Sequence, residues 1–357
     1  MIATIRLQNF RSYADTAFVF SSGVNIIVGP NASGKTNLLE AILVVARGSS
    51  YRVRDADMVA FGAPWARLDV RADNEERVVK LVCGPALEKT YDIAGRVFHR
   101  LTLAHSLPVV LFEPNHLALL GGSPERRRDY LDDLLTQTEP GYAATVRSYR
   151  RALAQRNRLL KTPQATADQF FPWNVRLSEL AARIVRSRVG LAATLNGAIG
   201  PLYGELSRTA TSVAIEYAGR ADAAHYESHM VRRLELCLND DRLRGFTSFG
   251  PHREDFVVLF DGRPAAEVAS RGEVRTVVLG LKIIELRMLE SLRDIRPILL
   301  LDDVFSELDA ARRRALTTHL QPYQTFITTT DADVVSRHFA DQSTIIRLEG
   351  GLAGGAA

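Results

Sequence analysis

Apolar residues follow two different spacings along the chain, and these spacings alternate near both ends. Residues 24–28 form a short run rich in β-branched side chains, and residues 35–47 repeat apolar positions at helical spacing. The C-terminal part continues the alternation, with segments typical of helix, strand, helix and strand at 272–294, 297–301, 309–320 and 324–329. This alternation is typical of parallel βαβ units, so we expect an α/β fold.

Arginine-rich helical patterns interrupt this alternation in the middle of the chain. We expect two long helices, at 124–161 and 174–207, which Pro163 and the segment Phe170-Phe171-Pro172-Trp173 separate. Strand-like composition precedes and follows them, at 66–70, 77–83, 213–218 and 256–260. The helices are therefore expected to be an insertion into a strand-containing core.

One split core explains this order better than two sequential domains. We expect residues 1–123 and 208–357 to form the core and residues 124–207 to form a helical insertion.

Composition narrows the class of protein without naming a function. The chain has 357 residues, of which 46% are hydrophobic, which excludes a disordered or collagen-like protein. The longest apolar run stops at two aspartates, and the two cysteines suit a reducing compartment, so we expect a cytoplasmic protein. The net charge of +4 permits an acidic partner. Forty of the 45 basic residues are arginines, which fits either phosphate contacts or codon bias.

A glycine-containing loop near the N-terminus predicts a phosphate site. The segment Gly29-Pro30-Asn31-Ala32-Ser33-Gly34-Lys35-Thr36 fits the pattern G-x-x-x-x-G-K-[ST], and it stands between a predicted strand and a predicted helix, as the pattern requires. Its glycines let successive N–H groups face a phosphate, and the helix adds its positive N-terminal end. We expect Lys35 to contact the β- and γ-phosphates and Thr36 to bind Mg²⁺.

A buried strand that ends in two carboxylates predicts the second half of the site. Residues 298–301 are four consecutive apolar residues, which is typical of a strand buried on both faces. Asp302 and Asp303 follow at its carboxyl end, where ligands gather in open α/β sheets. We expect Asp302 to complete the Mg²⁺ shell and Asp303 to act catalytically by polarising the attacking water. A simple helix or loop cap is the alternative for Asp303.

A third motif, Ser270-Arg271-Gly272, stands before a strongly amphipathic helix. Ser270 can cap that helix, and the N–H groups exposed there form a second anion site. A second anion site too far from the first to share its phosphate indicates binding in trans, with two chains enclosing two ATP molecules head to tail. The alternative for Ser270 is a helix cap without a role in anion binding.

GTPases are disfavoured, because no Asn-Lys-x-Asp sequence occurs.

Together these motifs resemble the ABC-type ATPases of the SMC group, and most closely the RecF family of bacterial recombination mediators. The resemblance covers essentially the whole chain and implies an ABC/SMC-like P-loop ATPase head with a helical insertion lobe. Besides the motifs above, it is carried by Asn9-Phe10-Arg11-Ser12-Tyr13, Asn37-Leu38-Leu39-Glu40-Ala41-Ile42, Phe112-Glu113-Pro114, Arg126-Arg127-Arg128 with Leu131-Asp132, Gly250-Pro251-His252-Arg253-Glu254-Asp255 and residues 302–309.

The resemblance implies a function. Members of the family bind duplex or gapped DNA, form a homodimer with ATP, hydrolyse ATP slowly in response to DNA, and work with RecO and RecR to load RecA at single-strand gaps. By the same resemblance, Arg11 and Asn37 lie near the nucleotide, Ser270 and Gly272 contact the partner's γ-phosphate, and residues 306–309 cross the dimer seam.

Three positions depart from the wider ABC pattern. Glu273 stands where the signature usually carries Gln, and Asp303 replaces the catalytic Glu, which is consistent with slow hydrolysis. The switch histidine is missing, and we expect Thr329 or Thr330 in its place. For the Q-loop residue, Glu113 and Asn115 are both candidates.

Basic residues crowd the helical insertion and are candidates for DNA contact. They are Arg126, Arg127, Arg128, Arg147, Arg150, Arg151, Arg156, Arg158, Lys161, Arg183, Arg186 and Arg188. Positions 147, 151 and 158 fall on one helical face, which indicates a surface that follows the phosphates of a DNA backbone. The alternative is a helix face that contacts only solvent.

Two other classes of protein stay open: a transporter ATPase subunit, and an SMC-like nuclease partner or small-molecule kinase.

Overall fold

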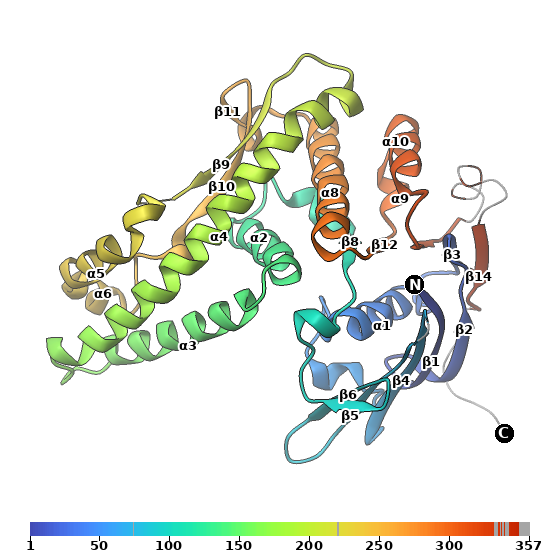
Figure 1. The fold of residues 1–357 in the computed structure, drawn as a ribbon, viewed down its shortest axis with the longest axis horizontal. Coiled ribbons are helices and arrows are strands. Elements are labelled where there is room, and N and C mark those ends of the chain that lie inside the picture. The colour runs from blue at the N-terminus through green and yellow to red at the C-terminus, as the bar shows by residue number, and fades with distance from the viewer. Residues whose placement is uncertain are drawn as a thin grey trace. The chain divides into compact units, whose positions relative to one another are not determined.

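The chain divides into two units, each with its own sheets and helices (Figure 1). Unit 1 comprises residues 1–116 and 285–357, and unit 2 comprises residues 117–284. The structure is a computed structural model that describes residues 1–73, 75–219, 221–331, 335, 337, 339 and 343–349. Within these residues, every helix is too short or too polar to cross a membrane.

A five-stranded parallel sheet of unit 1 confirms the expected α/β pattern. Its order is β14 (Ser343–Arg347), β3 (Val24–Val28), β13 (Thr325–Thr329), β12 (Ile298–Asp302) and β8 (Val109–Phe112). The strand β8 is buried throughout and β12 is buried up to Leu301, as is typical of near-continuous apolar runs in parallel sheets. The register pairs Asp302 with Thr328, which brings both residues to the carboxyl edge of the sheet.

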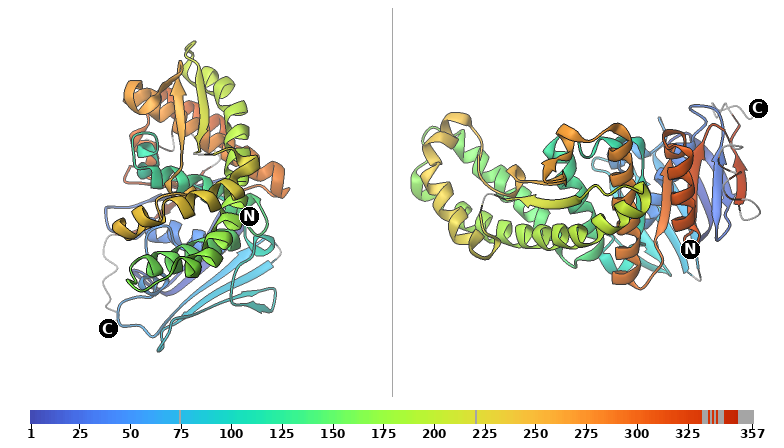
Figure 2. Two further views of the ribbon diagram at one scale, coloured as in Figure 1. Left: turned by 90° about the vertical axis from the view of Figure 1, so that its left-hand side faces the viewer. Right: turned by 90° about the horizontal axis from the view of Figure 1, so that it is seen from above.

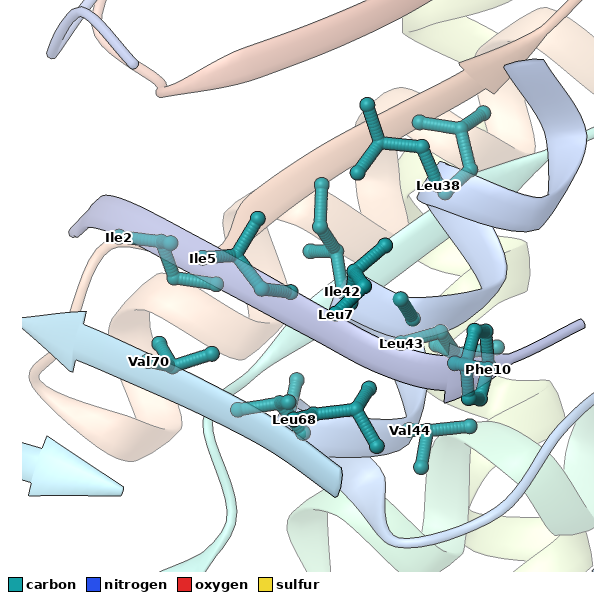
Figure 3. Packing of buried hydrophobic residues seen from close by; sticks show 14 of the residues in the cluster. Ile2, Ile5, Leu7, Phe10, Leu38, Ile42, Leu43, Val44, Leu68 and Val70 are labelled. Atoms are coloured by element: carbon teal, nitrogen blue, oxygen red, sulfur yellow. The ribbon is translucent and has the colours of Figure 1, made fainter. Parts of the chain in front are cut away.

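A second, antiparallel sheet of unit 1 covers the helix α1 (Lys35–Arg47) from another side. Its order is β2 (Tyr13–Val19), β1 (Ile2–Phe10), β4 (Trp65–Ala72), β5 (Glu75–Val82), β6 (Glu88–Ile93) and β7 (Arg96–Phe98). Figure 3 shows side chains of β1 and β4 gathered against α1. Residues 38–46 of α1 are all buried, because the helix contacts both sheets, and this burial fixes the position of its N-terminus.

Unit 2 is built on one long helix. The helix α4 (Ala167–Ser207) packs against α3 (Tyr142–Leu160) and against the strand β9 (Val213–Ala218), which runs alongside it (Figure 2). The strand β9 pairs with β10 (Asp255–Phe260), which pairs with β11 (Arg263–Pro264). The unit also contains the helices α2 (Pro124–Thr138), α5 (Tyr226–Leu236), α6 (Leu238–Arg244) and α7 (Ala265–Val268).

Three helices of the C-terminal part carry the predicted motifs. The helix α8 (Arg271–Arg293) begins at the Ser270 motif, and the boundary between the two units falls within it. The short helix α9 (Val304–Glu307) follows Asp303, and α10 (Ala310–Leu320) follows Asp309, whose side chain accepts a hydrogen bond from the backbone N–H of Arg312.

The expected helix boundaries in the middle of the chain were wrong at two points. The predicted helix 124–161 is two helices, because Pro140 lacks an N–H and Gly141 adopts a left-handed φ of 84°. The predicted start at 174 is also wrong, since α4 begins at Ala167 behind a capping box of Thr166 and Gln169. The proline at 172 lies inside α4, where it removes a single hydrogen bond from a helix of 41 residues.

The expected insertion, residues 124–207, lies wholly within unit 2, but the unit is larger. It continues to Ile284, because β9 packs along α4 and holds β10 and β11 with it. Residues 208–284, expected as part of the core, therefore belong to the same unit as the helices.

The Gly-Pro-His-Arg turn of unit 2 is only partly buried: Gly250 and Pro251 are buried, His252 is half-buried and Arg253 is exposed. The ring of His252 lies 2.7 Å from the Tyr149 hydroxyl through Nδ1 and 3.0 Å from the Thr247 carbonyl through Nε2. Burial lowers the pKa of His252 to about 4, and the neighbouring Arg253 contributes in the same direction. The imidazole therefore stays neutral and links α3 to the turn.

This burial predicts a pH dependence of stability. The pKa of His252 is lower in the folded chain than its ordinary value of 6.5, so its contribution is complete above pH 6.5 and is lost as the pH falls towards 4. The expected loss is about 3 kcal/mol of unfolding free energy. Urea unfolding followed by Trp173 fluorescence in a Trp65→Phe background measures it. A His252→Gln variant is expected to show a flatter dependence over this range, and an unchanged slope would contradict the assignment.

Candidate nucleotide-binding site

The predicted phosphate loop depends on two glycines for its shape. A Cβ at position 29 would lie 2.6 Å from the Ser33 hydroxyl and 2.7 Å from the Leu348 carbonyl oxygen. Gly34 has a φ of 98°, and a Cβ there would meet the Tyr13 hydroxyl at 2.9 Å. Ala32 also has a left-handed φ, of 64°. Alternating backbone conformations of this kind turn successive N–H groups towards one concave side, which suits an anion.

The Lys35 side chain folds back onto the start of the phosphate loop. Its ammonium group donates to the carbonyl oxygens of Gly29 (2.7 Å) and Pro30 (2.8 Å). Burial lowers the pKa of Lys35, while Asp303 and Asp302 oppose this shift. The result is a partly desolvated cation at the opening of α1, where a phosphate would meet it in a medium that screens charge weakly.

Three hydroxyl groups converge on the carboxylate of Asp302. Thr36 Oγ1 and Thr328 Oγ1 donate to Oδ1 at 3.0 and 2.7 Å, and the Tyr51 hydroxyl donates to Oδ2 at 3.0 Å. Burial, together with the carboxylates of Asp302 and Glu113, raises the pKa of Tyr51 and so keeps its hydroxyl protonated. Asp302 is therefore held in one orientation beside Thr36.

The Thr36 and Asp302 side chains suit a magnesium ion. Mg²⁺ prefers oxygen ligands and keeps several of its own waters, so it needs only one or two protein groups. The Thr36 hydroxyl and the Asp302 carboxylate are 3.0 Å apart, and hydrogen bonds from Tyr51 and Thr328 orient the carboxylate. The residues present therefore fit the expected metal.

Asp303 is held in an unusual backbone conformation. Its φ is 53°, and its N–H donates to the same Thr328 hydroxyl that binds Asp302, at 3.0 Å. The Ser306 hydroxyl lies 3.3 Å from its carboxylate, while the side chain itself is exposed. A non-glycine residue in this region of backbone space is strained, and such strain persists where the surrounding contacts hold it.

The predicted loop and strand meet around one cavity of about 370 Å³. Lys35 and Thr36 line it together with Asp302 and Asp303, so the structure brings together the two halves of the predicted site. The other residues of its wall are Asn31, Ala32, Gly34, Asn37, Arg52 and Thr328.

Arg11 lies at a neighbouring cavity of about 690 Å³, which Asn37 also lines. Its Nε is 3.0 Å from the fully buried Glu40 carboxylate, and its Nη1 donates to the Asp57 carbonyl at 2.9 Å. The structure therefore places Arg11 beside the predicted nucleotide site and gives its guanidinium two protein partners.

Ser270 and Glu273 form a reciprocal cap at the start of α8. The N–H of Ser270 donates to the Glu273 carboxylate at 2.7 Å, and the N–H of Glu273 donates to the Ser270 hydroxyl at 3.3 Å. The predicted cap is confirmed, and it also explains Glu273, since either Glu or Gln can accept at this position. Ser270 and Gly272 belong to unit 2, whereas the phosphate loop belongs to unit 1.

Three residues at the site were not expected from the sequence. Thr328 contacts Asp302, and the Thr329 hydroxyl bonds to the backbone of Asp331, while Thr329 or Thr330 in place of the switch histidine stays a prediction. Tyr51 and Arg52 were not expected at all, because they follow α1 in a loop without a recognisable motif. Of the Q-loop candidates, Glu113 lies close enough to Tyr51 to raise its pKa.

Several predicted DNA-binding arginines are structural instead. Arg156 is fully buried and pairs with the buried Asp241, and Arg188 is buried against Asp132. Arg127 pairs with Asp255, and Arg128 donates to the Glu254 carbonyl. These arginines tie elements of unit 2 together. The assignment of the buried Arg156 and Arg188 to a DNA surface was wrong, whereas Arg127 and Arg128 are half-buried and their assignment stays a prediction.

The remaining basic residues are exposed. The predicted face of α3 is confirmed as a surface, because Arg147, Arg151 and Arg158 all lie in solvent. Further exposed cations of the same unit are Arg126, Arg150, Lys161, Arg183 and Arg186. The assignment of these exposed residues to a DNA surface stays a prediction.

The fold and the site define a P-loop ATPase head of the ABC/SMC class. The family model for the RecF/RecN/SMC N terminal domain matches residues 1–351. An SMC head bound to the C-winged helix domain of ScpA has the same fold, with a TM-score of 0.53 over 94% of this chain and 91% of that chain at 18% identity.

Within this class, the chain belongs to the RecF family. DNA replication and repair protein RecF of Symbiobacterium thermophilum is 36% identical over 98% of this chain and 97% of its own, and that of Heliobacterium modesticaldum is 34% identical over 98% of each. The structure of a recombination mediator protein RecF-ATPrS of the RecFOR pathway is similar, with a TM-score of 0.87 and 30% identity over 97% of this chain and 95% of that chain.

Proposed function

We propose that this chain is an ATP-driven switch of recombinational DNA repair. ATP closes two copies into a homodimer on duplex or gapped DNA, and the closed dimer works with RecO and RecR to promote RecA loading at single-strand gaps. Slow, DNA-dependent hydrolysis then releases the dimer. The proposal is carried by one observation: Lys35, Thr36 and Asp302 line the same cavity. The similarity of the chain to RecF proteins supports it.

The residues of the cavity have separable roles in this proposal. Lys35 exchanges its two carbonyl partners for the β- and γ-phosphates, while the turned N–H groups of the loop bind the β-phosphate. Mg²⁺, held by Thr36 and Asp302, neutralises charge on the phosphates when it is bound. Asp303 accepts a proton of the attacking water, and its shorter side chain limits the rate relative to a glutamate. Thr328 couples the two aspartates because one hydroxyl binds both.

The proposed dimer places Ser270 and Gly272 of one copy against the γ-phosphate held by the other. A Ser270→Arg variant is expected to bind ATP normally, because the phosphate loop is unchanged, but to stay monomeric with ATP. Sedimentation velocity with and without ATP measures this. Ser270→Thr is the matched control, since it keeps the capping hydroxyl and is expected to dimerise. A Ser270→Arg protein that dimerises normally with ATP would overturn binding in trans.

The exposed face of α3 is the proposed path of a DNA backbone. Replacing Arg147, Arg151 and Arg158 together with alanine is expected to weaken DNA binding and to reduce the slope of log affinity against log salt by about 2 to 3. Fluorescence anisotropy of labelled gapped duplex at several salt concentrations measures both quantities.

A matched control removes the same charge from unit 1. The exposed arginines Arg71, Arg96 and Arg100 are replaced with alanine together, and the slope is expected to stay close to that of the unmodified chain. Equal losses in the two triple variants would mean that net charge, and not the face of α3, determines the affinity.

A further inference from the structure

A cavity in unit 2 gathers three arginines that the proposed function does not use. It has a volume of about 370 Å³ and lies between α5, α6 and the turn that ends at Arg253. Arg233, Arg244 and Arg253 line it and are exposed. In the part of the chain that the structure describes, none of the three makes an ion pair with a carboxylate.

Aromatic rings hold two of these guanidinium groups in place. The Arg253 guanidinium lies 4.7 Å from the centre of the Phe246 ring, and that of Arg233 lies 5.9 Å from the centre of the Phe249 ring. Cation–π contacts of this kind fix a guanidinium while leaving its N–H groups available. The cavity therefore presents ordered donors for carboxylate or phosphate oxygens.

Large apolar side chains are exposed at the same cavity. Phe246, which lines it, is 40% exposed, and Leu236, which precedes the cavity-lining Cys237 at the end of α5, is 67% exposed. Exposed apolar residues beside arginine are typical of protein interfaces. Aliphatic side chains contribute nothing to the binding of a phosphate backbone.

The lining also argues against single-stranded nucleic acid. A single strand binds on several aromatic faces in succession, whereas here Phe249 is only 4% exposed and the Arg253 guanidinium occupies one face of Phe246. Asp240 also lines the cavity, where its carboxylate can accept the N–H of a peptide backbone, a donor that a phosphate backbone lacks. A peptide with both carboxylate and apolar side chains uses every feature of the surface.

We propose that the cavity formed by Arg233, Arg244, Arg253 and Phe246 is a docking site for an acidic segment of a partner protein, with an apolar side chain packed against Phe246. The site lies wholly in unit 2 and does not depend on ATP. It therefore stands or falls separately from the switch proposed above.

The test uses the full-length chain and a fluorescein-labelled peptide of sequence Asp-Glu-Leu-Asp-Glu-Phe. Anisotropy is expected to show saturable binding that falls at least tenfold in Arg233→Glu and in Arg253→Glu. Arg232→Glu makes the same charge change at an exposed neighbour outside the cavity, and it is expected to alter the affinity less than twofold. Absence of peptide binding, or equal losses in all three variants, would overturn the proposal.

Two further measurements locate the site and identify its ligand. Cys237 lines the cavity, whereas Cys83 lies in unit 1, so the peptide is expected to slow alkylation of Cys237 and leave Cys83 unaffected. A labelled twelve-nucleotide oligothymidylate is expected to bind the Arg233→Glu and Arg253→Glu proteins as it binds the unmodified chain. If those variants lose the oligonucleotide and keep the peptide, the cavity is a nucleic-acid site and the proposal is wrong.

Discussion

Replacing Lys35 with methionine is expected to lower ATP turnover by about 100-fold or more, the effect of removing a positioned charge from a desolvated site. The ammonium group lies at the start of α1, where burial lowers its pKa. Because water screens charge only weakly at such a site, the loss of this positive charge is expected to weaken the contact with the phosphates strongly. Methionine keeps the volume of the side chain and removes only the charge. Phosphate release and the binding of a fluorescent ATP analogue measure the two parts of the effect.

Lys89 offers a matched control for this variant. It is a second partly buried lysine of unit 1, whose ammonium group donates to the Gly48 carbonyl and to Asp55. Lys89→Met removes the same charge outside the nucleotide cavity, and turnover is expected to change little. Wild-type turnover in Lys35→Met would mean that the loop does not bind the reacting phosphates.

Replacing Arg156 with alanine is expected to destabilise unit 2 by about 3 to 5 kcal/mol, the cost of breaking a buried ion pair on one side. Arg156 and Asp241 are both fully buried, and their closest atoms are 2.8 Å apart. The same guanidinium donates to Asn174 and Thr247 and to the Leu234 carbonyl. Its loss leaves Asp241 charged in the interior and breaks links from α3 to α4, to α5 and to the turn that follows α6.

Urea unfolding in a Trp65→Phe background isolates this effect, because Trp173 then reports on α4 of unit 2 alone. Arg158→Ala is the control, since Arg158 lies two residues away on the exposed face and is expected to change the unfolding free energy by less than about 0.5 kcal/mol. Similar shifts in the two variants would contradict the distinction between structural and surface arginines.

The sequence predicts local motifs, but it does not distinguish a buried structural arginine from an exposed one. Local motifs predicted the phosphate loop, the strand with Asp302 and Asp303, and the Ser270 cap, because each depends on neighbouring residues and on the edge of a sheet. Helical spacing also identified the exposed face of α3. The spacing of arginines could not show that Arg156 faces Asp241, which lies 85 positions further along the chain.

Tertiary hydrogen bonds explain the other omissions. Tyr51 reaches Asp302 across 251 positions, and nothing in the loop after α1 indicates such a contact. The contact of Thr328 with Asp302 depends in the same way on the register of β13 with β12, which pairs the two residues. The break at Pro140 and Gly141 was present in the sequence, whereas Pro172 showed that a proline near the start of a long helix need not end it.

The central claim is that ATP closes two copies of this chain on DNA. The most direct test is the rate of ATP turnover per chain, measured over a range of protein concentrations with and without gapped duplex DNA. The account predicts that turnover per chain rises with protein concentration and is stimulated by the DNA. A turnover per chain that is constant with concentration and indifferent to DNA would contradict the proposed dimer while leaving the nucleotide site intact.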